Sequence, residues 1–278
     1  MAQFTNQAQL TYGNVVTSSN VAVGEIVAVL SATKTAIRQE YNQGSAIAYI
    51  INIVNSGSTN VTGLTVSDNL GEYEFGVGTL VPLDYVDGTL LYFLDGTPQP
   101  APQVSSENGL TVTGISVPAN GNALLVYETN VNGYAPLNEG GTITNTVTIT
   151  GECANVVASE TVSAASAPQI TISKSISPVP VSCGDRVTYT FLIQNTGASP
   201  LAATDNAVVT DTFNPIISDV TATLNGAPVE FTYDEATGEL ATAQGAVTVP
   251  GATYTQDLTT GLWSITPGTA TLVVTGTI

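Results

Sequence analysis

The sequence contains no histidine and only two cysteines among its 278 residues. Without histidine, Ser-His-Asp and Cys-His nucleophile systems are excluded, as is every metal site that needs an imidazole ligand. No Asp-x-Asp-x-Asp-Gly calcium loop is present either. We therefore expect no cofactor, no metal site and no enzyme of a familiar kind. The cysteines, Cys153 and Cys183, are too few for a disulfide scaffold and could pair, stay free or bridge two molecules.

Basic residues are nearly as scarce. Four of them stand against 22 acidic residues, which gives a formal net charge of -18. Such a surface repels nucleic acid and anionic membranes, so we expect neither as a partner. No apolar run is long enough to span a bilayer. The first three residues carry neither the basic segment nor the apolar core of a secretion signal, so a leader was either removed or never present.

Helical periodicity is also missing, apart from a short stretch around Glu235. The sequence instead has many short runs rich in Thr and Val, bounded by Asn and Gly, and this pattern is typical of strands and turns. The chain is long enough for two domains of ordinary size. These features predict an all-β fold.

The two halves of the sequence repeat one another. Each half has a lysine followed, at the same offsets, by a glycine, a tyrosine and an Asn-x-Gly turn. The positions are Lys34, Gly44, Tyr49, Asn55 and Gly57 in the first copy and Lys174, Gly184, Tyr189, Asn195 and Gly197 in the second. Further matches join residues 64–70 to 208–213, 92–98 to 222–228 and 123–127 to 270–274. The second of these carries an Asp-Gly or Asn-Gly hairpin turn in each copy.

Short alternating strands separated by turns at this spacing predict two tandem immunoglobulin-like β-sandwiches. Only the first copy has a closing strand, at residues 143–151, whereas the second ends at Ile278 without one. A segment similar to that closing strand lies at residues 4–13. We therefore predict an N-terminal donor strand in residues 1–13, a sandwich in 14–152 and an incomplete sandwich in 153–278.

Linker lengths support this division. Asn145 in the closing strand precedes Lys174 by 29 residues, and Asn6 in the N-terminal segment precedes Lys34 by 28. If the N-terminal segment of one molecule completes the second domain of another, the linker from that strand into the next domain has nearly the same length between two molecules as between the two domains of one molecule.

Four segments of the second copy carry a family resemblance: residues 172–178 (ISKSISP), 184–190 (GDRVTYT), 195–197 (NTG) and 209–213 (VTDTF). They resemble the conserved surface repeat of bacteria and archaea, the domain of unknown function that is numbered eleven. The first copy matches more loosely, with Ser45 where the second has Asp185. The resemblance implies tandem extracellular sandwiches on cell or spore surfaces, often with internal isopeptide bonds, and says little about any partner.

Polar residues interrupt the apolar stripes at matching places. Side chains two apart in a strand share a face, so the only lysines, Lys34 and Lys174, each lie among apolar neighbours, where lysine is rarely found unless paired. Asp68 and Asp211 interrupt a second stripe. Asn145 does so in the closing strand, and Asn6 does so in the N-terminal segment, whose inward residues are Phe4, Asn6, Ala8, Leu10 and Tyr12.

A lysine, an acid and an asparagine are the set that a spontaneous Lys–Asn isopeptide bond requires, similar in chemistry to collagen-adhesin and pilin domains. Burial favours neutral, nucleophilic lysine. It also favours a protonated Asp68 or Asp211, which would polarise the Asn carbonyl and shuttle protons as ammonia leaves. We expect Lys34 to bond to Asn145 within a molecule and Lys174 to bond to Asn6 of another. The alternative is a buried Lys–Asp ion pair without covalent chemistry.

An open sandwich exposes an unpaired edge and an apolar groove that a donated strand can fill. Because donor and acceptor lie at opposite ends of the chain, the contact extends head to tail. We therefore expect a structural fibre subunit, a homopolymer on a cell or spore surface, with a tip or anchor protein left unidentified. This crosslinking consumes its own residues, so it is not enzymatic turnover.

Three alternatives stay open at this point. A monomeric surface adhesin would bind a host or matrix ligand through its sandwich loops. An enzyme acting on an external substrate would need a nucleophile motif that we do not recognise. In a self-complemented monomer, residues 4–12 would fold back into the second domain of their own chain, which the matched linker lengths argue against.

Overall fold

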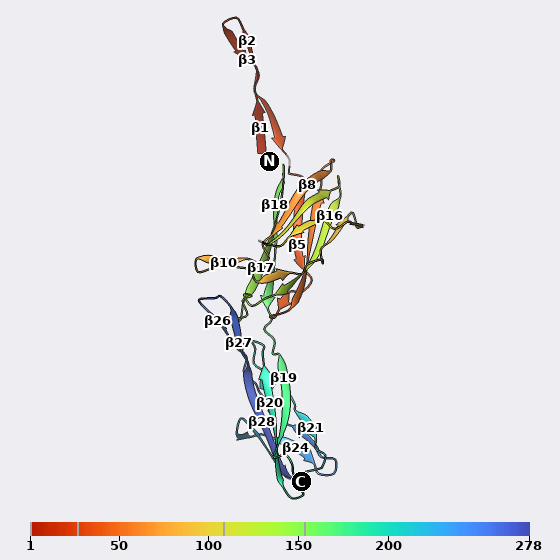
Figure 1. The fold of residues 1–278 in the computed structure, drawn as a ribbon, viewed down its shortest axis with the longest axis vertical. Helices are drawn as coiled ribbons and strands as arrows, with labels where there is room; N and C mark the ends of the chain where they lie inside the picture. The colour runs from red at the N-terminus through yellow and green to blue at the C-terminus, as the bar shows by residue number, and fades with distance from the viewer. Residues whose placement is uncertain (1, 27, 108, 153) are drawn as a thin grey trace. The chain divides into compact units, whose positions relative to one another are not determined.

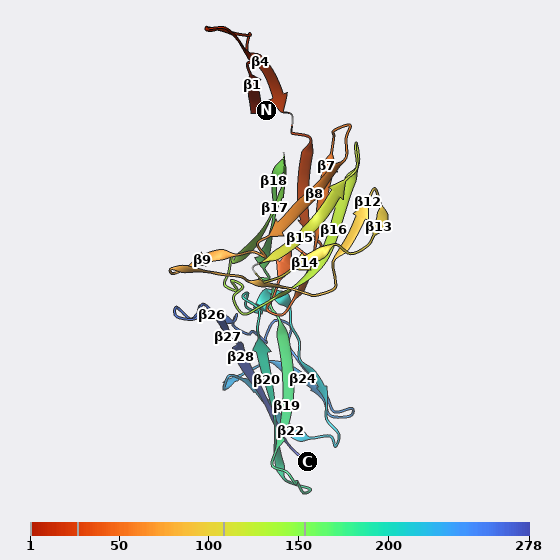
Figure 2. The ribbon, with the colours of Figure 1, turned by 45° about the horizontal axis from the view of Figure 1, so that its top comes forward.

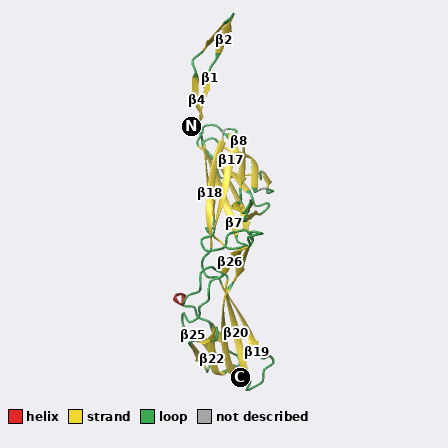
Figure 3. Ribbon diagram, turned by 90° about the vertical axis from the view of Figure 1, so that its left-hand side faces the viewer, coloured by secondary structure: helices red, strands yellow, loops and turns green. Residues whose placement is uncertain are grey.

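The computed structural model of the chain describes residues 2–26, 28–107, 109–152 and 154–278, and the backbone alone for residues 2, 3, 25 and 26. Its regular structure is strands plus one 3-10 helix at Ala203–Asp205 (Figures 1 and 3). The predicted all-β fold is confirmed. By its contacts the chain divides into two compact units, Met1–Gln39 with Gly44–Asn132 and Thr144–Val162, and Glu40–Gln43 with Gly133–Ile143 and Ser163–Ile278. In the ranges described, no helix is long and apolar enough to cross a membrane.

The first sandwich has two large sheets (Figure 2). One follows the order β13-β12-β16-β7-β5, with β11 also on β16; its strands are β5 (Leu30–Ala36), β7 (Ala46–Asn55), β11 (Leu83–Tyr85), β12 (Leu91–Leu94), β13 (Thr97–Gln99) and β16 (Asn122–Val131). The other follows the order β14-β15-β8-β17-β18-β6; its strands are β6 (Glu40–Tyr41), β8 (Val61–Asp68), β14 (Gln103–Ser105), β15 (Leu110–Val117), β17 (Thr142–Gly151) and β18 (Ala154–Ala164). A small hairpin joins β9 (Tyr73–Phe75) to β10 (Gly78–Leu80).

Alternating burial shows which face of each strand meets the core. In β7 the inward residues Ile47, Tyr49, Ile51 and Ile53 are at most 1% exposed, and β16, β8 and β17 alternate in the same way. The period of two is a property of extended backbone. Any residue two positions from a buried apolar one is therefore directed into the same core, whatever its polarity.

The second sandwich has a five-stranded sheet in the order β19-β20-β28-β22-β23 and a three-stranded sheet in the order β21-β25-β24. The strands are β19 (Ile170–Ser177), β20 (Arg186–Asn195), β21 (Thr210–Thr212), β22 (Ser218–Leu224), β23 (Ala227–Pro228), β24 (Phe231–Asp234), β25 (Glu239–Thr242) and β28 (Gly268–Thr277). A further hairpin joins β26 (Thr253–Gln256) to β27 (Trp263–Thr266). Core residues of this sandwich include Tyr189, Phe191, Phe213 and Leu272.

The two sandwiches share their register as well as their strand order. Lys34 lies opposite Ile51 across β5 and β7, and Lys174 lies opposite Phe191 across β19 and β20. The predicted hairpin turns also match, because the Asp95-Gly96 and Asn225-Gly226 pairs all have positive φ, as two-residue hairpin turns require. The repeat read from the sequence is therefore a repeat of structure.

The second sandwich lacks the counterparts of β17 and β18. In the first sandwich β8 pairs with β15 on one side and with β17 on the other. In the second, the equivalent strand β21 pairs with β25, and among the described residues no strand pairs with its other edge. The expected missing closing strand is confirmed, and the strand that should follow it is missing too.

The N-terminal residues form a long two-stranded arm. Its strands are β1 (Ala2–Asn6), β2 (Gln9–Tyr12), β3 (Val15–Ser18) and β4 (Ala22–Ile26). β1 pairs with β4, and β2 pairs with β3 (Figures 1 and 2). We predicted a single strand here, and the structure instead gives a hairpin.

The predicted domain boundaries do not coincide with this pairing. The boundary between residues 13 and 14 falls in the turn of the arm, so residues 15–26 pair with the donor segment and with no strand of the first sandwich. The boundary between residues 152 and 153 separates β17 from β18, which lie in one sheet. Both discrepancies arise because the sequence argument followed single strands, whereas the chain pairs these strands as hairpins.

Candidate crosslinking site

Three strands bring the predicted residues of the first sandwich together. Lys34 is on the inward face of β5, Asp68 ends β8, and Asn145 is on β17, where Val147 lies opposite Asp68. The side chains of Lys34 and Asp68 are 0% and 1% exposed, and Asn145 is fully buried. All three predicted residues of this domain thus lie inside one core.

A chain of hydrogen bonds connects the three side chains. Lys34 Nζ donates to Asp68 Oδ2 at 2.5 Å, and the Tyr127 hydroxyl donates to the same oxygen at 2.5 Å. Leu70 N donates to the other carboxylate oxygen at 3.0 Å. Asn145 Nδ2 in turn donates to the Tyr127 hydroxyl at 3.3 Å. Tyr127, on β16, therefore bridges the acid and the amide.

Tyr127 was not among the predicted site residues. It lies on the inward face of β16 with Ala123 and Leu125, so its hydroxyl was a polar group on an apolar stripe, the same signal that identified Lys34. What the sequence could not give was its partner, because β16 and β8 belong to different sheets.

The hydroxyl also fixes the orientation of the Asn145 amide. A tyrosine hydroxyl has one proton, and here it goes to Asp68, so Tyr127 can only accept from Asn145. The amide nitrogen therefore faces Tyr127. Asn145 Oδ1 and the Tyr49 hydroxyl are buried without a hydrogen-bond partner. Buried unsatisfied groups are few in native proteins, and two of them lie in this site.

The electrostatics favour a neutral amine. Burial lowers the pKa of Lys34 to about 8, although the nearby Asp68 carboxylate opposes the shift. Burial, with a contribution from Asp68, raises the pKa of Tyr49 and of Tyr127, so both hydroxyls keep their protons at neutral pH. The two rings stack at 5.8 Å between centroids, and Lys34 Nζ lies 5.0 Å from the centroid of Tyr49.

The second sandwich repeats half of this site. Lys174 on β19 donates to Asp211 on β21, and its Nζ lies 4.7 Å from the ring centroid of Tyr189 and 5.2 Å from that of Phe213. The position of Tyr127 is taken by Val274, which lies opposite Tyr189 as Tyr127 lies opposite Tyr49. Among the described residues no strand pairs with the edge of β21 away from β25, so no asparagine takes the place of Asn145 there.

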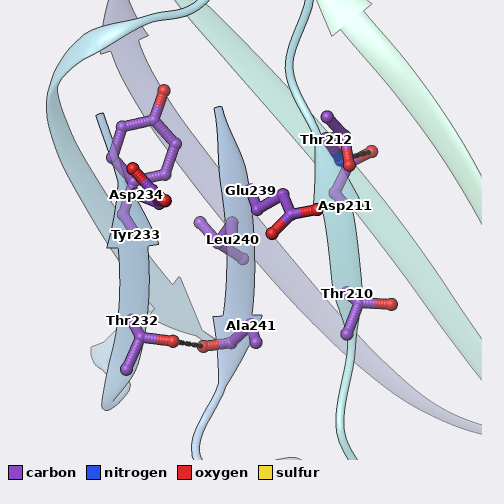
Figure 4. A pocket seen from close by; sticks show the side chains of 9 residues that line it. All are labelled: Thr210, Asp211, Thr212, Thr232, Tyr233, Asp234, Glu239, Leu240 and Ala241. Carbon is purple, nitrogen blue, oxygen red and sulfur yellow. Dashed lines mark hydrogen bonds between the residues drawn. The ribbon is translucent and has the colours of Figure 1, made fainter. Parts of the chain in front are cut away.

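The missing strand leaves the second site open. The Lys174 and Asp211 side chains are 39% and 17% exposed, against 0% and 1% in the first sandwich. Ile172 on the inward face of β19 is 53% exposed. Figure 4 shows Asp211 beside the strand that carries Glu239 and Leu240, in a pocket over this three-stranded sheet. A half-site with an apolar floor is thus accessible at the free edge of β21.

The structure does not bring Asn6 to Lys174 within one chain. Asn6 lies opposite Ala22 in the arm, and the five predicted donor residues, Phe4, Asn6, Ala8, Leu10 and Tyr12, are all exposed. Residues 4–6 pair with β4 and residues 9–12 pair with β3, so the structure places them in the arm. Cys183 is exposed and free, and Cys153 lies outside the described residues.

No protein-family model matches the chain, and neither does any curated protein sequence. Among solved structures it is similar to BcpA, the major pilin subunit of Bacillus cereus (12% identity, 95% of this chain and 66% of that one, TM-score 0.37). It is also similar to the pilus backbone RrgB of Streptococcus pneumoniae (12% identity, 86% and 55%, TM-score 0.36) and to the collagen-binding domain of a Staphylococcus aureus adhesin (13% identity, 50% and 99%, TM-score 0.32).

Proposed function

We propose that this protein is a structural subunit of an extracellular fibre on a cell or spore surface, which polymerises head to tail by strand donation. One observation carries the proposal: the three-stranded sheet of the second sandwich matches β14, β15 and β8 of the first, and among the described residues no strand pairs with the edge of β21 where β17 and β18 would follow. The Lys174–Asp211 pair of this sandwich is half exposed where the equivalent pair is buried. An unpaired edge beside an apolar surface is an aggregation hazard unless a strand fills it.

The N-terminal segment of another subunit fits this vacancy. When Asn6 takes the position of Asn145, Ala8 takes that of Val147 and lies opposite Asp211, because Val147 lies opposite Asp68. Phe4, Leu10 and Tyr12, now 55% to 63% exposed, then face inward with Asn6. Added main-chain pairing supplies affinity, and the alternating side chains supply register.

Each sandwich then holds the groups for one Lys–Asn bond. In the first, the Lys34 ammonium passes a proton to Asp68, and the neutral Nζ attacks Asn145 Cγ. The bond from Cγ to Nδ2 breaks as Nδ2 receives one proton from Nζ and one from Asp68. Nitrogen leaves as ammonium, Asp68 ends ionised, and a Lys34–Asn145 amide remains. The Tyr127 hydroxyl contacts both Asp68 and Nδ2, so it relays the second proton.

In the second sandwich the same reaction joins Lys174 to Asn6 of the neighbouring subunit, with Asp211 as the acid. Val274 offers no hydroxyl, so this bond forms without the relay. The pairing of strands holds the reacting atoms close together, and this proximity replaces turnover catalysis.

Two variants test the proposal. Removing residues 1–12 should leave monomers by size-exclusion chromatography and negative-stain microscopy, and filaments that persist would contradict strand donation.

Asn6→Ala should still give filaments, but these should dissociate in hot detergent. Asn145→Ala is the matched control: it should keep detergent-resistant ladders, and each subunit should retain the mass of one ammonia that the crosslinked parent loses, once the mass change of the substitution itself is subtracted. Ladders from Asn6→Ala would rule out the Lys174–Asn6 bond.

A further inference from the structure

We infer that the donated element is the whole N-terminal hairpin, residues 2–26, and that it enters the neighbouring subunit without opening. This inference rests on the proposed function and specifies its joint: the partner is a second copy of this chain, and its arm supplies two strands. The completed sheet would have the order β24-β25-β21 followed by the β1–β2 strand and then the β3–β4 strand. This is the order β14-β15-β8-β17-β18 of the first sandwich.

The arm matches the β17–β18 hairpin in length to within one residue. In that hairpin Thr144 bonds to Thr161 through their hydroxyls, and Ala164 N donates to Gly141 O. When Asn6 is placed on Asn145, Thr5 corresponds to Thr144, and it faces Val23 in the arm. Val23 follows Thr5 by 18 residues, against 17 between Thr144 and Thr161, so the arm has one extra residue; it lies between Ser19 and Ala22, where the pairing shifts as at a β-bulge.

The arm leaves free the same edge that β17 uses. Ser19 N donates to Ala8 O at 2.9 Å, and Ala8 N donates to Ser19 Oγ at 3.0 Å, so the backbone groups of Ala8 point into the hairpin. Successive residues of a strand direct these groups to alternate sides, so those of Gln7 point to the other edge. Its counterpart Thr146 uses that edge to bond with Asn69, next to Asp68, at 3.0 and 2.8 Å.

Donating the closed hairpin also costs less free energy than opening it. Donation of residues 4–12 alone would break the backbone pairing of β1 with β4 and of β2 with β3, and each hydrogen bond lost costs about 1 kcal/mol. It would also leave residues 15–26 unpaired. A lone two-stranded hairpin is marginal in water, whereas docking on β21 places it in a larger sheet and loses none of its bonds.

The connections between the hairpins and the sandwiches also support donation of a closed hairpin. The outer strand of the first hairpin, β18, leads into β19 through residues 165–169. The outer strand of the arm, β4, leads into β5 through residues 27–29. In both cases a short connection leads from the second strand of a hairpin into the first strand of the next sandwich, so a polymer of closed hairpins has a connection of the same kind within and between subunits.

A disulfide across the arm tests whether the arm opens. Thr11 lies directly opposite Val16, on the face away from Asn6, Leu10 and Tyr12. In a Cys153→Ser/Cys183→Ser background, Thr11→Cys/Val16→Cys closes the hairpin when oxidised. We expect the oxidised and reduced proteins to polymerise at equal rates, within about twofold. Polymerisation by the reduced form alone would overturn hairpin donation and leave single-strand donation intact.

The pair Thr5→Cys/Val23→Cys supplies a second closure, at the other end of the hairpin. If both variants fail to polymerise even when reduced, the face opposite Asn6 is buried in the joint, which contradicts the predicted orientation. The cysteine-free background is the reference: if it fails to polymerise while the parent does, the cysteines form the joint, and if the parent also fails, strand donation itself is wrong.

Discussion

The side chain of Asn145 donates a hydrogen bond to the hydroxyl of Tyr127, 3.3 Å away, and that hydroxyl donates to Asp68. The nitrogen that must leave in an isopeptide reaction is thus one hydroxyl away from the acid that would protonate it. Lys34, on a fourth strand, contacts the same carboxylate oxygen. Four strands from two sheets therefore converge on one proton path.

Removing the hydroxyl tests this path. Tyr127→Phe keeps the ring in the core but removes the relay, and we expect the Lys34–Asn145 bond to form about 100-fold more slowly, the scale of a lost proton-transfer group. The rate is followed as the loss of one ammonia by mass spectrometry after refolding. Tyr49→Phe is the matched control, because it removes a hydroxyl from the same core without removing the hydrogen bond that Tyr127 makes to Asp68. Equal slowing in both variants would indicate a packing effect.

The two acids should differ in their effect on stability. Asp68→Ala leaves Lys34 buried without its ion-pair partner and should destabilise the first sandwich by about 3–5 kcal/mol. Asp211→Ala removes a pair whose lysine side chain is 39% exposed, so the loss should be about 0–1 kcal/mol. Urea unfolding of monomers in an Asn145→Ala background, where the first bond cannot form, measures both. Similar losses in the two sandwiches would contradict the difference in burial.

The two lysines should also differ in reactivity toward an amine-specific acylating reagent. In a monomeric Asn145→Ala variant lacking residues 1–12, Lys174 should be modified readily and Lys34 should be protected, because their side chains are 39% and 0% exposed. Peptide mapping gives the two extents of modification directly. In filaments of Asn6→Ala, which cannot form the bond, Lys174 should become protected as well. Persistent labelling there would show that the donated strands do not cover the half-site.

The pH dependence of bond formation tests the role of Asp68. Lys34 has a pKa of about 8 because burial disfavours its charge. The reactive state, with a neutral amine and the proton on Asp68, holds as many protons as the ion pair, so the rate should be constant from neutral pH up to pH 8. Above pH 8 the pair loses its proton, and the rate should fall about tenfold per pH unit. Mass spectrometry at intervals after refolding gives the profile. A rate that rises toward pH 8 would show that Asp68 does not carry the proton.

Local sequence determined much of this protein. The period of two in extended backbone set the inward positions of Lys34, Asp68 and Asn145, and the structure places all three in one core. The internal repeat showed that the second copy lacks a closing strand. Both inferences succeed because they need only the spacing of residues along one strand or between two copies.

Other features were decided by tertiary structure. Lys34 and Lys174 occupy equivalent positions in sequence, yet one is buried and the other half exposed, because β17 and β18 cover the first and nothing equivalent covers the second among the described residues. Tyr127 contacts Asp68 because the two sheets that carry them pack face to face, and this packing is not apparent from the sequence. Residues 15–26 belong to the arm because they pair with residues 2–12. The sequence of one strand does not reveal which other strand lies at its edge or in what register. The sequence determined which side chains face inward, and the packing of sheets decided which of them meet and which remain exposed.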